Sequence, residues 1–236
     1  MHISDGILTP AWCIFWYLLT AGFVAGGVIQ IRRKSVNNPQ YLPMLALMGA
    51  AVLVISVWHI PVPVTGSSSH PCGTPMAAII VGPFPVAAIS AIVLFFQTFV
   101  GHGGITTIGA NDFSMGIVGA FTGYGTWLAL RGRTSIFVAA GMAGLIGDVM
   151  TYVTAAFELA ISIHPEAWLN YIGIFMLGYL PTQAPLAVLE FVFTGLVIRY
   201  IADTRPEMMK WAGWAPPVKS TVTTGGTGGT GGAPGE

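Results

Sequence analysis

The sequence predicts an all-α, polytopic integral membrane protein with about seven transmembrane helices. Of its 236 residues, 54% are hydrophobic and only 8% are charged, and the mean hydropathy is +0.74. A soluble domain carries roughly a quarter charged residues, so this composition fits a lipid bilayer better than water. Nine basic residues balance nine acidic ones, which leaves no basic excess of the kind that binds nucleic acid.

Apolar segments long enough for helices recur along the chain, separated by short polar stretches. We expect helices over residues 12–31, 43–58, 74–82, 85–100, 114–130, 135–161 and 182–201. The third segment is short, and the prolines of "VGPFP" prevent it from continuing into the fourth, which predicts a tight helical hairpin. Residues 165–180 are rich in Trp and Tyr and are interpreted as an interfacial or re-entrant segment.

Basic residues predict the orientation of these helices. They follow the first, fifth and seventh segments, as Arg32, Arg33 and Lys34, then Arg131 and Arg133, then Arg199, Arg205 and Lys210. Alternate threading places all of them on one side, which the positive-inside rule makes cytoplasmic. The amino terminus is then outside and the carboxyl terminus inside. The five histidines fall in or next to external segments, namely His2, His59, His70, His102 and His164.

The domain organisation follows from the same patterns. Residues 1–203 are expected to form a membrane domain, and the Gly- and Thr-rich residues 204–236 a flexible cytoplasmic tail. No Lys or Arg precedes Trp12, so we expect no signal peptide and a retained Met1. No GxxxxGK[ST] loop is present, so the chain by itself is not expected to hydrolyse ATP.

The opening "MHISDGILTP" places a histidine directly behind the methionine. The amine of Met1, the amide of His2 and the imidazole of His2 can close two chelate rings in one plane. A deprotonated amide suits Ni²⁺ or Cu²⁺ in square-planar geometry. His70, in the Gly-, Ser- and Pro-rich stretch "VTGSSSHPCGTP", is the candidate for the fourth nitrogen. The alternative is a frayed terminus with an unused histidine.

Other polar residues have structural interpretations. We expect His59 at the membrane interface, His102 in a turn made by the glycines of "GHGG", and Asn111 with Asp112 as the N-cap of the helix from 114. Two cysteines make no disulfide framework. Cys13 and Cys72 are interpreted as packing residues, although Cys72 stands two residues from His70 and could be a softer ligand.

Three carboxylates fall inside expected helices, namely Asp148, Glu158 and Glu190. Buried ionisable groups in a membrane are functional candidates by default. They would allow an autonomous proton-coupled carrier, which is the second hypothesis for this chain. The alternative is that they hydrogen-bond to backbone, to serines or to one another. An intramembrane hydrolase is a third hypothesis, for which the chain has no HExxH motif.

Small residues four apart let helices approach closely, and they occur twice, as Ala21 with Ala25 and as Ala46 with Ala50. The spacing fits a contact with a partner helix and equally well packing within the chain.

Three blocks, "MHISDGILTP", "GSSSHPCGTPMAAIIVGP" and "GANDFSMGIVGAFTGY", resemble in order and spacing those of the CbiM/NikM family. That family comprises the substrate-binding membrane subunits (S components) of energy-coupling factor transporters for cobalt and nickel. The resemblance runs from Met1 to about Ile201. It implies seven helices, and a metal held by the amine of Met1, the amide and imidazole of His2, and His70.

The resemblance also implies partners and a location. These are a transmembrane coupling subunit, two cytoplasmic ATPase subunits and a small accessory membrane subunit, in the cytoplasmic membrane of a prokaryote. An AxxxA pattern that contributes to the coupling contact corresponds to Ala46 and Ala50. Ni²⁺ or Co²⁺ is then the transported substrate, with no catalytic residue and no cofactor in this chain.

One departure from the family pattern bears on the metal. Many relatives follow the loop histidine with an apolar residue and glycines, where this chain has Pro71, Cys72, Gly73 and Thr74. The "DG" of the opening block is more similar to the nickel branch than to the cobalt branch. The sequence therefore favours Ni²⁺ slightly over Co²⁺.

Overall fold

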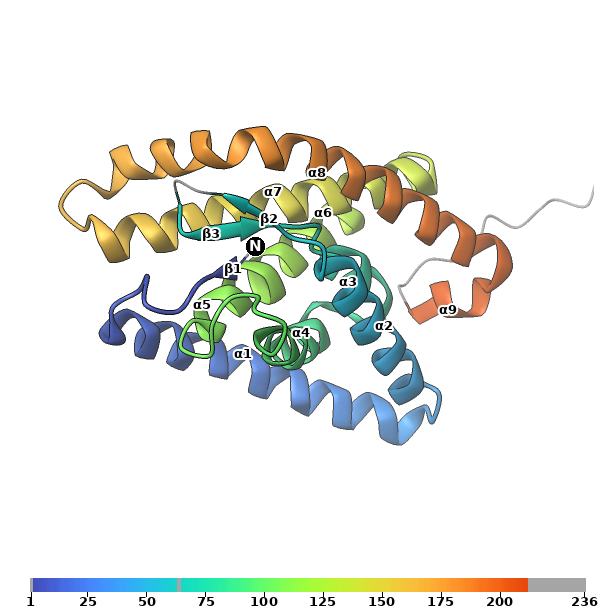
Figure 1. Ribbon diagram of the computed structural model, residues 1–236. Helices are drawn as coiled ribbons and strands as arrows, with labels where there is room; N and C mark the ends of the chain where they lie inside the picture. Colours follow the sequence, from blue (N-terminus) through green and yellow to red (C-terminus); the bar gives the residue numbers. More distant parts are fainter. Residues whose placement is uncertain (1, 63–64, 212–236) are drawn as a thin grey trace, which may run out of the picture.

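The computed structural model describes residues 2–62 and 65–211, and its elements are helices apart from one small sheet (Figure 1). The helices are α1 (Pro10–Asn37), α2 (Tyr41–Ser56), α3 (Thr74–Val81), α4 (Pro83–Thr98), α5 (Ile108–Asp112), the π-helix η1 (Phe113–Gly119), α6 (Ala120–Leu130), α7 (Ile136–Ile163), α8 (Trp168–Thr204) and α9 (Pro206–Trp211). The strands are β1 (His2–Ile3), β2 (Ile60–Val62) and β3 (Ser67–Ser69).

Each apolar segment of the sequence has a helical counterpart. Within the described residues, α1, α7 and α8 are long and apolar enough to cross a membrane, with 28, 28 and 37 residues, while α2 and α4 are shorter apolar helices. The expected fifth helix is part of a longer helical run, in which α5, η1 and α6 follow one another without a break. The count of about seven spans stays a prediction.

Two expectations about secondary structure are wrong. Residues 165–180 do not form a separate interfacial segment, because α8 runs from Trp168 to Thr204 through Pro181 and Pro185. Neighbouring helices can satisfy the backbone groups that such prolines release in a membrane helix. The chain is also not purely α-helical, since β1, β3 and β2 form an antiparallel sheet in that order.

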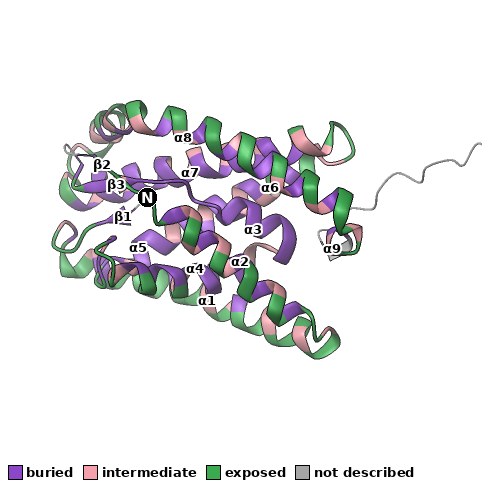
Figure 2. Ribbon diagram, turned by 45° about the vertical axis from the view of Figure 1, so that its right-hand side comes forward, coloured by how far each residue is buried: buried purple, intermediate pink, exposed green. Residues whose placement is uncertain are grey.

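The helix α3 is the centre of the molecule. All eight of its residues are buried, and Figure 2 shows it as a buried element between partly exposed helices. At about 1.5 Å per residue it is much shorter than a bilayer core of roughly 30 Å. Gly82, with φ +95°, joins it directly to α4, as the hairpin prediction requires. Glycine suits this joint because other residues rarely adopt a positive φ.

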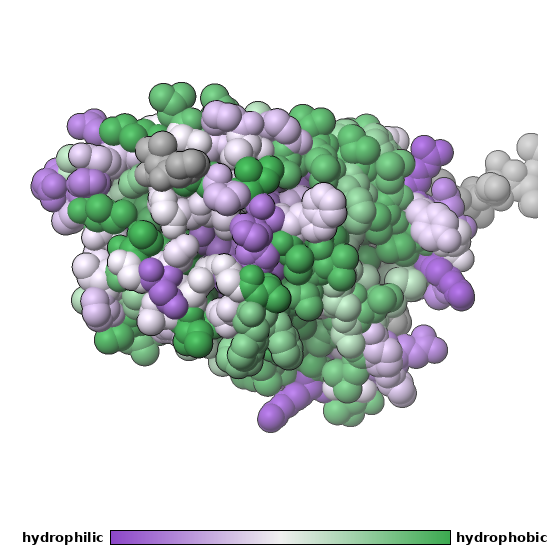
Figure 3. All heavy atoms as spheres, viewed as in Figure 1, coloured by the Kyte–Doolittle hydropathy of each residue, from purple (hydrophilic) through white to green (hydrophobic). Residues whose placement is uncertain are grey.

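The outer helices expose apolar side chains, as a lipid-facing surface does. Leu18, Val54 and Leu177 are each at least 70% exposed, and Figure 3 shows a broad hydrophobic belt on this face of the molecule. In water such a surface would be unfavourable, since burial of apolar area contributes about 25 cal/mol per Å². The exposed surface thus supports the assignment to a membrane.

The two ends of the helical bundle differ in composition. The basic end carries the carboxyl ends of α1, α6 and α8 with their arginines and lysines, on the right in Figure 1. The histidine end carries the sheet, the loop 99–107 and the turn between α7 and α8 (Figure 1). The clustering that the sequence predicts is therefore present in the fold. Which end faces the cytoplasm stays a prediction.

Part of the segment expected as a flexible tail is helical. The short helix α9 follows α8, and Met209 within it is buried. Residues 212–236 lie outside the described residues.

Candidate metal-binding site

The sheet brings His2 and His70 together. β1 pairs with β3 so that His2 stands opposite Ser68. His70 comes two residues after Ser68, just beyond the end of β3. In an antiparallel pair, the residue two positions further on lies diagonally across on the same face. The imidazole rings of His2 and His70 accordingly lie with their centroids 4.4 Å apart, and the two planes are tilted by 33°.

Side chains from α5 and the residue before it hold β1 in place. The Ile3 amide donates to Asn111 Oδ1 at 2.7 Å, and Asn111 Nδ2 donates back to the Ile3 carbonyl at 3.1 Å. Thr107 Oγ1 donates to the same carbonyl at 2.6 Å. The N-cap prediction for Asn111 and Asp112 is wrong, because both residues lie inside the helical run. Asn111 instead binds the backbone next to His2, and Asp112 accepts a hydrogen bond from Ser90.

His70 is fixed at both its backbone and its ring. Its amide donates to Tyr152 Oη at 3.0 Å, and the same hydroxyl donates to its carbonyl at 3.2 Å. Its Nδ1 lies 2.8 Å from the carbonyl of Pro71, which accepts a hydrogen bond only if Nδ1 carries the proton. The tautomer that makes this bond has its lone pair on Nε2, the form in which a histidine binds a metal through Nε2.

Both rings are buried. His2 is 1% exposed and His70 is 0% exposed, and burial lowers the pKa of each imidazole well below its usual value. Neutral imidazole is the form that binds metals. Neither ring nitrogen of His2 makes a hydrogen bond within the described residues. Buried polar groups in native proteins nearly always have a partner, so this ring is suited to a ligand.

Gln97 is a further polar group that the sequence did not single out. Its Nε2 donates to Ser56 Oγ at 2.6 Å, and its Oε1 has no hydrogen-bond partner in the described part of the chain. Burial lowers the pKa of the His2 imidazole, and the nearby Gln97 side chain opposes this with a smaller effect in the other direction. Histidines that bind metals commonly donate their second ring N–H to such an oxygen.

A glycine loop closes over His2. A Cβ placed on Gly103 would meet the His2 Cβ at 3.3 Å and Asn111 Nδ2 at 3.1 Å, and its φ is +65°. The loop also buries His102, which is 3% exposed and lies with its ring 6.0 Å from that of His2. The sequence placed His102 in a turn but gave no reason to expect it beside His2.

The other predicted ligands have different outcomes. Met1 lies outside the described residues, so its amine has no position here. Among the described residues, no group of three or more His, Cys, Asp and Glu side chains could hold a metal ion. The proposed ligand set has only two side chains and depends on backbone nitrogens for the rest.

Cys72 is buried beside two of the intramembrane carboxylates. Its thiol interacts with Asp148, and its amide interacts with Glu190. Glu190 Oε1 also accepts the Gly73 amide at 2.7 Å, and Asp148 accepts a hydrogen bond from Gln183. Glu190 therefore binds the loop that carries His70, and Asp148 binds α8 through Gln183. This agrees with the structural interpretation of two of the three acids.

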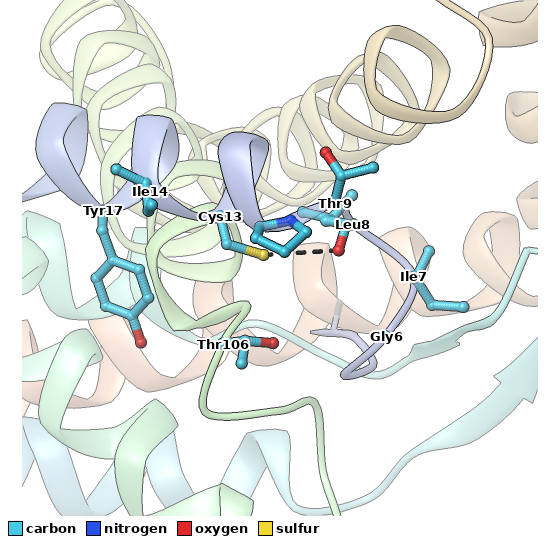
Figure 4. Close-up of a pocket in the computed structure, with 9 residues that line it drawn as sticks. Gly6, Ile7, Leu8, Thr9, Cys13, Ile14, Tyr17 and Thr106 are labelled. Carbon is cyan, nitrogen blue, oxygen red and sulfur yellow. Dashed lines mark hydrogen bonds between the residues drawn. The ribbon is translucent and has the colours of Figure 1, made fainter.

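A hollow of about 640 Å³ lies next to the N-terminal segment (Figure 4). It is lined by mostly apolar residues: Gly6, Ile7, Leu8, Thr9, Pro10, Cys13, Ile14, Tyr17 and Thr106. Cys13 Sγ interacts with the carbonyl of Leu8 at its edge. Neither His2 nor His70 lines this hollow, so it is distinct from the histidine pair.

The small-residue pair Ala46 and Ala50 is exposed on α2. Both line a groove of about 370 Å³ between α2 and α4, with apolar side chains around them. Ala21 and Ala25 are exposed on α1. The exposure of Ala46 and Ala50 leaves them accessible to another helix.

Together, the apolar helices and the buried imidazole pair at one end define a membrane protein with a polar site built from its N-terminal segment. Residues 2–208 match the family model of CbiM, described as the cobalt uptake substrate-specific transmembrane region. The chain belongs to the CbiM family. It is 39% identical over 213 residues to a cobalt transport protein CbiM of Sorangium cellulosum, with 89% of this chain and 94% of that protein covered.

Further relatives and a solved structure agree. A putative cobalt transport protein CbiM of Methanocaldococcus jannaschii is 38% identical over 218 residues, which cover 92% of this chain and 93% of that protein. A crystal structure described as a truncated transition metal transporter matches with a TM-score of 0.75 and 26% identity. The match covers 86% of this chain and 99% of that one.

Proposed function

We propose that this chain is the substrate-binding S component of an energy-coupling factor transporter, which binds Co²⁺ or Ni²⁺ outside the cell and carries it across the cytoplasmic membrane of a prokaryote. The observation that carries the proposal is the approach of two buried imidazoles, His2 and His70, at one end of a CbiM-family fold. The relatives are named for cobalt, so Co²⁺ replaces Ni²⁺ as the first ion to test.

In this proposal the ion is the substrate and loses its water on entering the site. The amine of Met1 and the amide and Nδ1 of His2 supply three nitrogens, and His70 supplies the fourth through Nε2. Removal of the amide proton makes capture stronger as the pH rises. A planar set of nitrogen ligands suits Ni²⁺ and accepts Co²⁺.

The partners follow from family membership. A transmembrane coupling subunit would bind the surface that contains Ala46 and Ala50, which is exposed. Two cytoplasmic ATPase subunits would supply the energy, with a small accessory membrane subunit. An autonomous proton-coupled carrier remains the second candidate. It is favoured less because two of its acids already have structural partners. Glu190 accepts the backbone amide of Gly73, and Asp148 interacts with the side chains of Gln183 and Cys72.

The test is to insert one glycine between Met1 and His2. The insertion separates the amine from the imidazole and destroys the chelate rings, but it leaves the histidine side chains in the chain. We expect the affinity for Co²⁺ and Ni²⁺ to fall by more than about 100-fold, which exceeds the usual loss when a residue that only supports a metal ligand is replaced. The affinity is measured by calorimetry on protein with a native amino terminus.

The square-planar absorption of the Ni²⁺ complex should disappear in the same variant. A glycine inserted after Gly132, in the turn between α6 and α7 at the basic end, is the matched control and should leave binding unchanged. Unchanged affinity after the first insertion would remove Met1 and His2 from the site. Metal uptake by vesicles that lack ATPase subunits would favour the proton-coupled carrier.

A further inference from the structure

Four histidines form a row from the surface to the interior at the histidine end. Their order is His59, His102, His2 and His70, and the ring centroids of neighbours lie 3.7, 6.0 and 4.4 Å apart. His59 is exposed, whereas the other three are at most 3% exposed. The row therefore connects the solvent with the buried pair of the proposed metal site.

The outer two histidines contact each other directly. His102 Nε2 and His59 Nδ1 share a hydrogen bond, and the two ring planes are almost perpendicular, at 84°. His102 Nδ1 is buried and has no hydrogen-bond partner in the described part of the chain. The two residues come from distant segments, since His59 lies between α2 and β2 and His102 lies in the glycine loop.

We propose that His59 and His102 form an outer, transient site for a divalent transition-metal ion, which then passes to His2 and His70. This inference rests on the proposed function, because the inner pair must be the final site. An ion bound by the two imidazoles replaces the hydrogen bond between them. Co²⁺ and Ni²⁺ are transition-metal ions of intermediate softness, and imidazole nitrogens are good ligands for such ions.

The outer site has the properties that a transfer step requires. No third His, Cys, Asp or Glu among the described residues joins the pair, so water completes the coordination of the ion. Such a site binds weakly and releases its ion quickly. A site on the path of entry raises the rate of capture without changing the final affinity, because it alters the route and not the end states.

A purely structural role for the pair makes a different prediction. The hydrogen bond between the rings could simply hold the glycine loop over His2. The substitution His59→Asn separates the two roles, because the Asn side chain keeps a hydrogen-bonding group close to the position of Nδ1 but is a poor ligand for these metals. His164→Asn is the matched control, since His164 stacks on Tyr171 away from the row.

The experiment measures Co²⁺ binding to purified full-length protein by stopped-flow absorption and by equilibrium titration. We expect His59→Asn to slow association and dissociation of Co²⁺ by about tenfold each, within the range by which a local site raises capture rates, and to leave the affinity unchanged. His164→Asn should change neither rate. Unchanged rates in His59→Asn, or a loss of affinity equal to the loss in association rate, would overturn the inference.

A second measurement tests the outer site without the inner one. In the variant with a glycine inserted before His2, equilibrium dialysis against millimolar Co²⁺ should show one weakly bound ion, which His59→Asn removes. Absence of that ion would overturn the inference while the tight site of the parent protein stands. Absence of tight binding in the parent protein would instead overturn the proposed function.

Discussion

The histidine end and the basic end of the bundle are held together in different ways. At the histidine end, the hydrogen bonds join segments far apart in the chain, as Ile3 with Asn111 and His70 with Tyr152 do. At the basic end, Lys34 Nζ and Tyr41 Oη both donate to the carbonyl of Val81, at 3.0 and 2.9 Å, and many other bonds are local. Arg133 donates to the carbonyl of Ala129, and Arg199 and Asp203 form an exposed ion pair one helical turn apart. Long-range hydrogen bonds thus fix the backbone next to both histidines of the candidate site, whereas at the basic end two such bonds share the carbonyl of Val81.

The largest loss of stability and metal affinity at the histidine end is expected from Asn111→Ala. The substitution leaves the buried Ile3 amide without its partner, which costs about 1–3 kcal/mol in the free energy of unfolding. It also releases the backbone next to His2, so metal affinity should fall by about 10- to 100-fold, as for other supports of metal ligands. Calorimetric titration with Co²⁺ and thermal unfolding in detergent measure the two effects.

Asn38→Ala at the basic end is its control. Within the described part of the chain, Asn38 Oδ1 accepts the exposed amide of Gln40, so its removal should change neither affinity nor stability appreciably. Equal losses in both variants would contradict the contrast between the ends.

A smaller effect is expected from Gly103→Ala. The left-handed backbone costs an alanine about 1–2 kcal/mol, and the new Cβ presses on His2 and Asn111. Gly132 at the basic end has φ +78° and open space around its Cβ position. Gly132→Ala therefore has the same backbone cost without the contact. We expect both variants to lose stability in thermal unfolding and only Gly103→Ala to lose Co²⁺ affinity.

The smallest effect is expected from Arg199→Ala. The ion pair with Asp203 has an N–O distance of 3.9 Å, and both side chains are more than 60% exposed. Such pairs contribute about 0–1 kcal/mol, so the free energy of unfolding should change by less than about 0.5 kcal/mol. A loss as large as that of Asn111→Ala would show that this exposed ion pair contributes as much to stability as the buried bonds of Asn111.

The sequence predicted the helices better than the contacts between them. Apolar segments fix where helices form, and the prolines around Gly82 marked the hairpin correctly. The segment 165–180 was misplaced because its aromatic residues suggested an interface, while its helix continues through two prolines that a bundle tolerates. β1 has only two residues and β3 consists of three serines, so neither strand has an alternation of polar and apolar residues that would predict the sheet.

The candidate site was predicted in part. His2 and His70 were paired on the chemistry of their nitrogens and on the family resemblance, and the structure brings their rings together. Asn111 was misassigned because a polar residue just before an apolar run is typical of an N-cap. Its bonds to Ile3 span 108 positions, and no local pattern reports a contact of that kind. His102 was missed as a neighbour of His2 for the same reason.

The strand β1 also sets an order of events during synthesis. Its two residues leave the ribosome first, but Ser67, Ser68 and Asn111, which hold them, are made much later. At about 5–20 residues per second, the beginning of the chain waits roughly 5–20 s before its last partner exists. During that interval β1 can form neither its strand pairing nor its bonds to Asn111, so the capture of the strand comes later than the synthesis of α5.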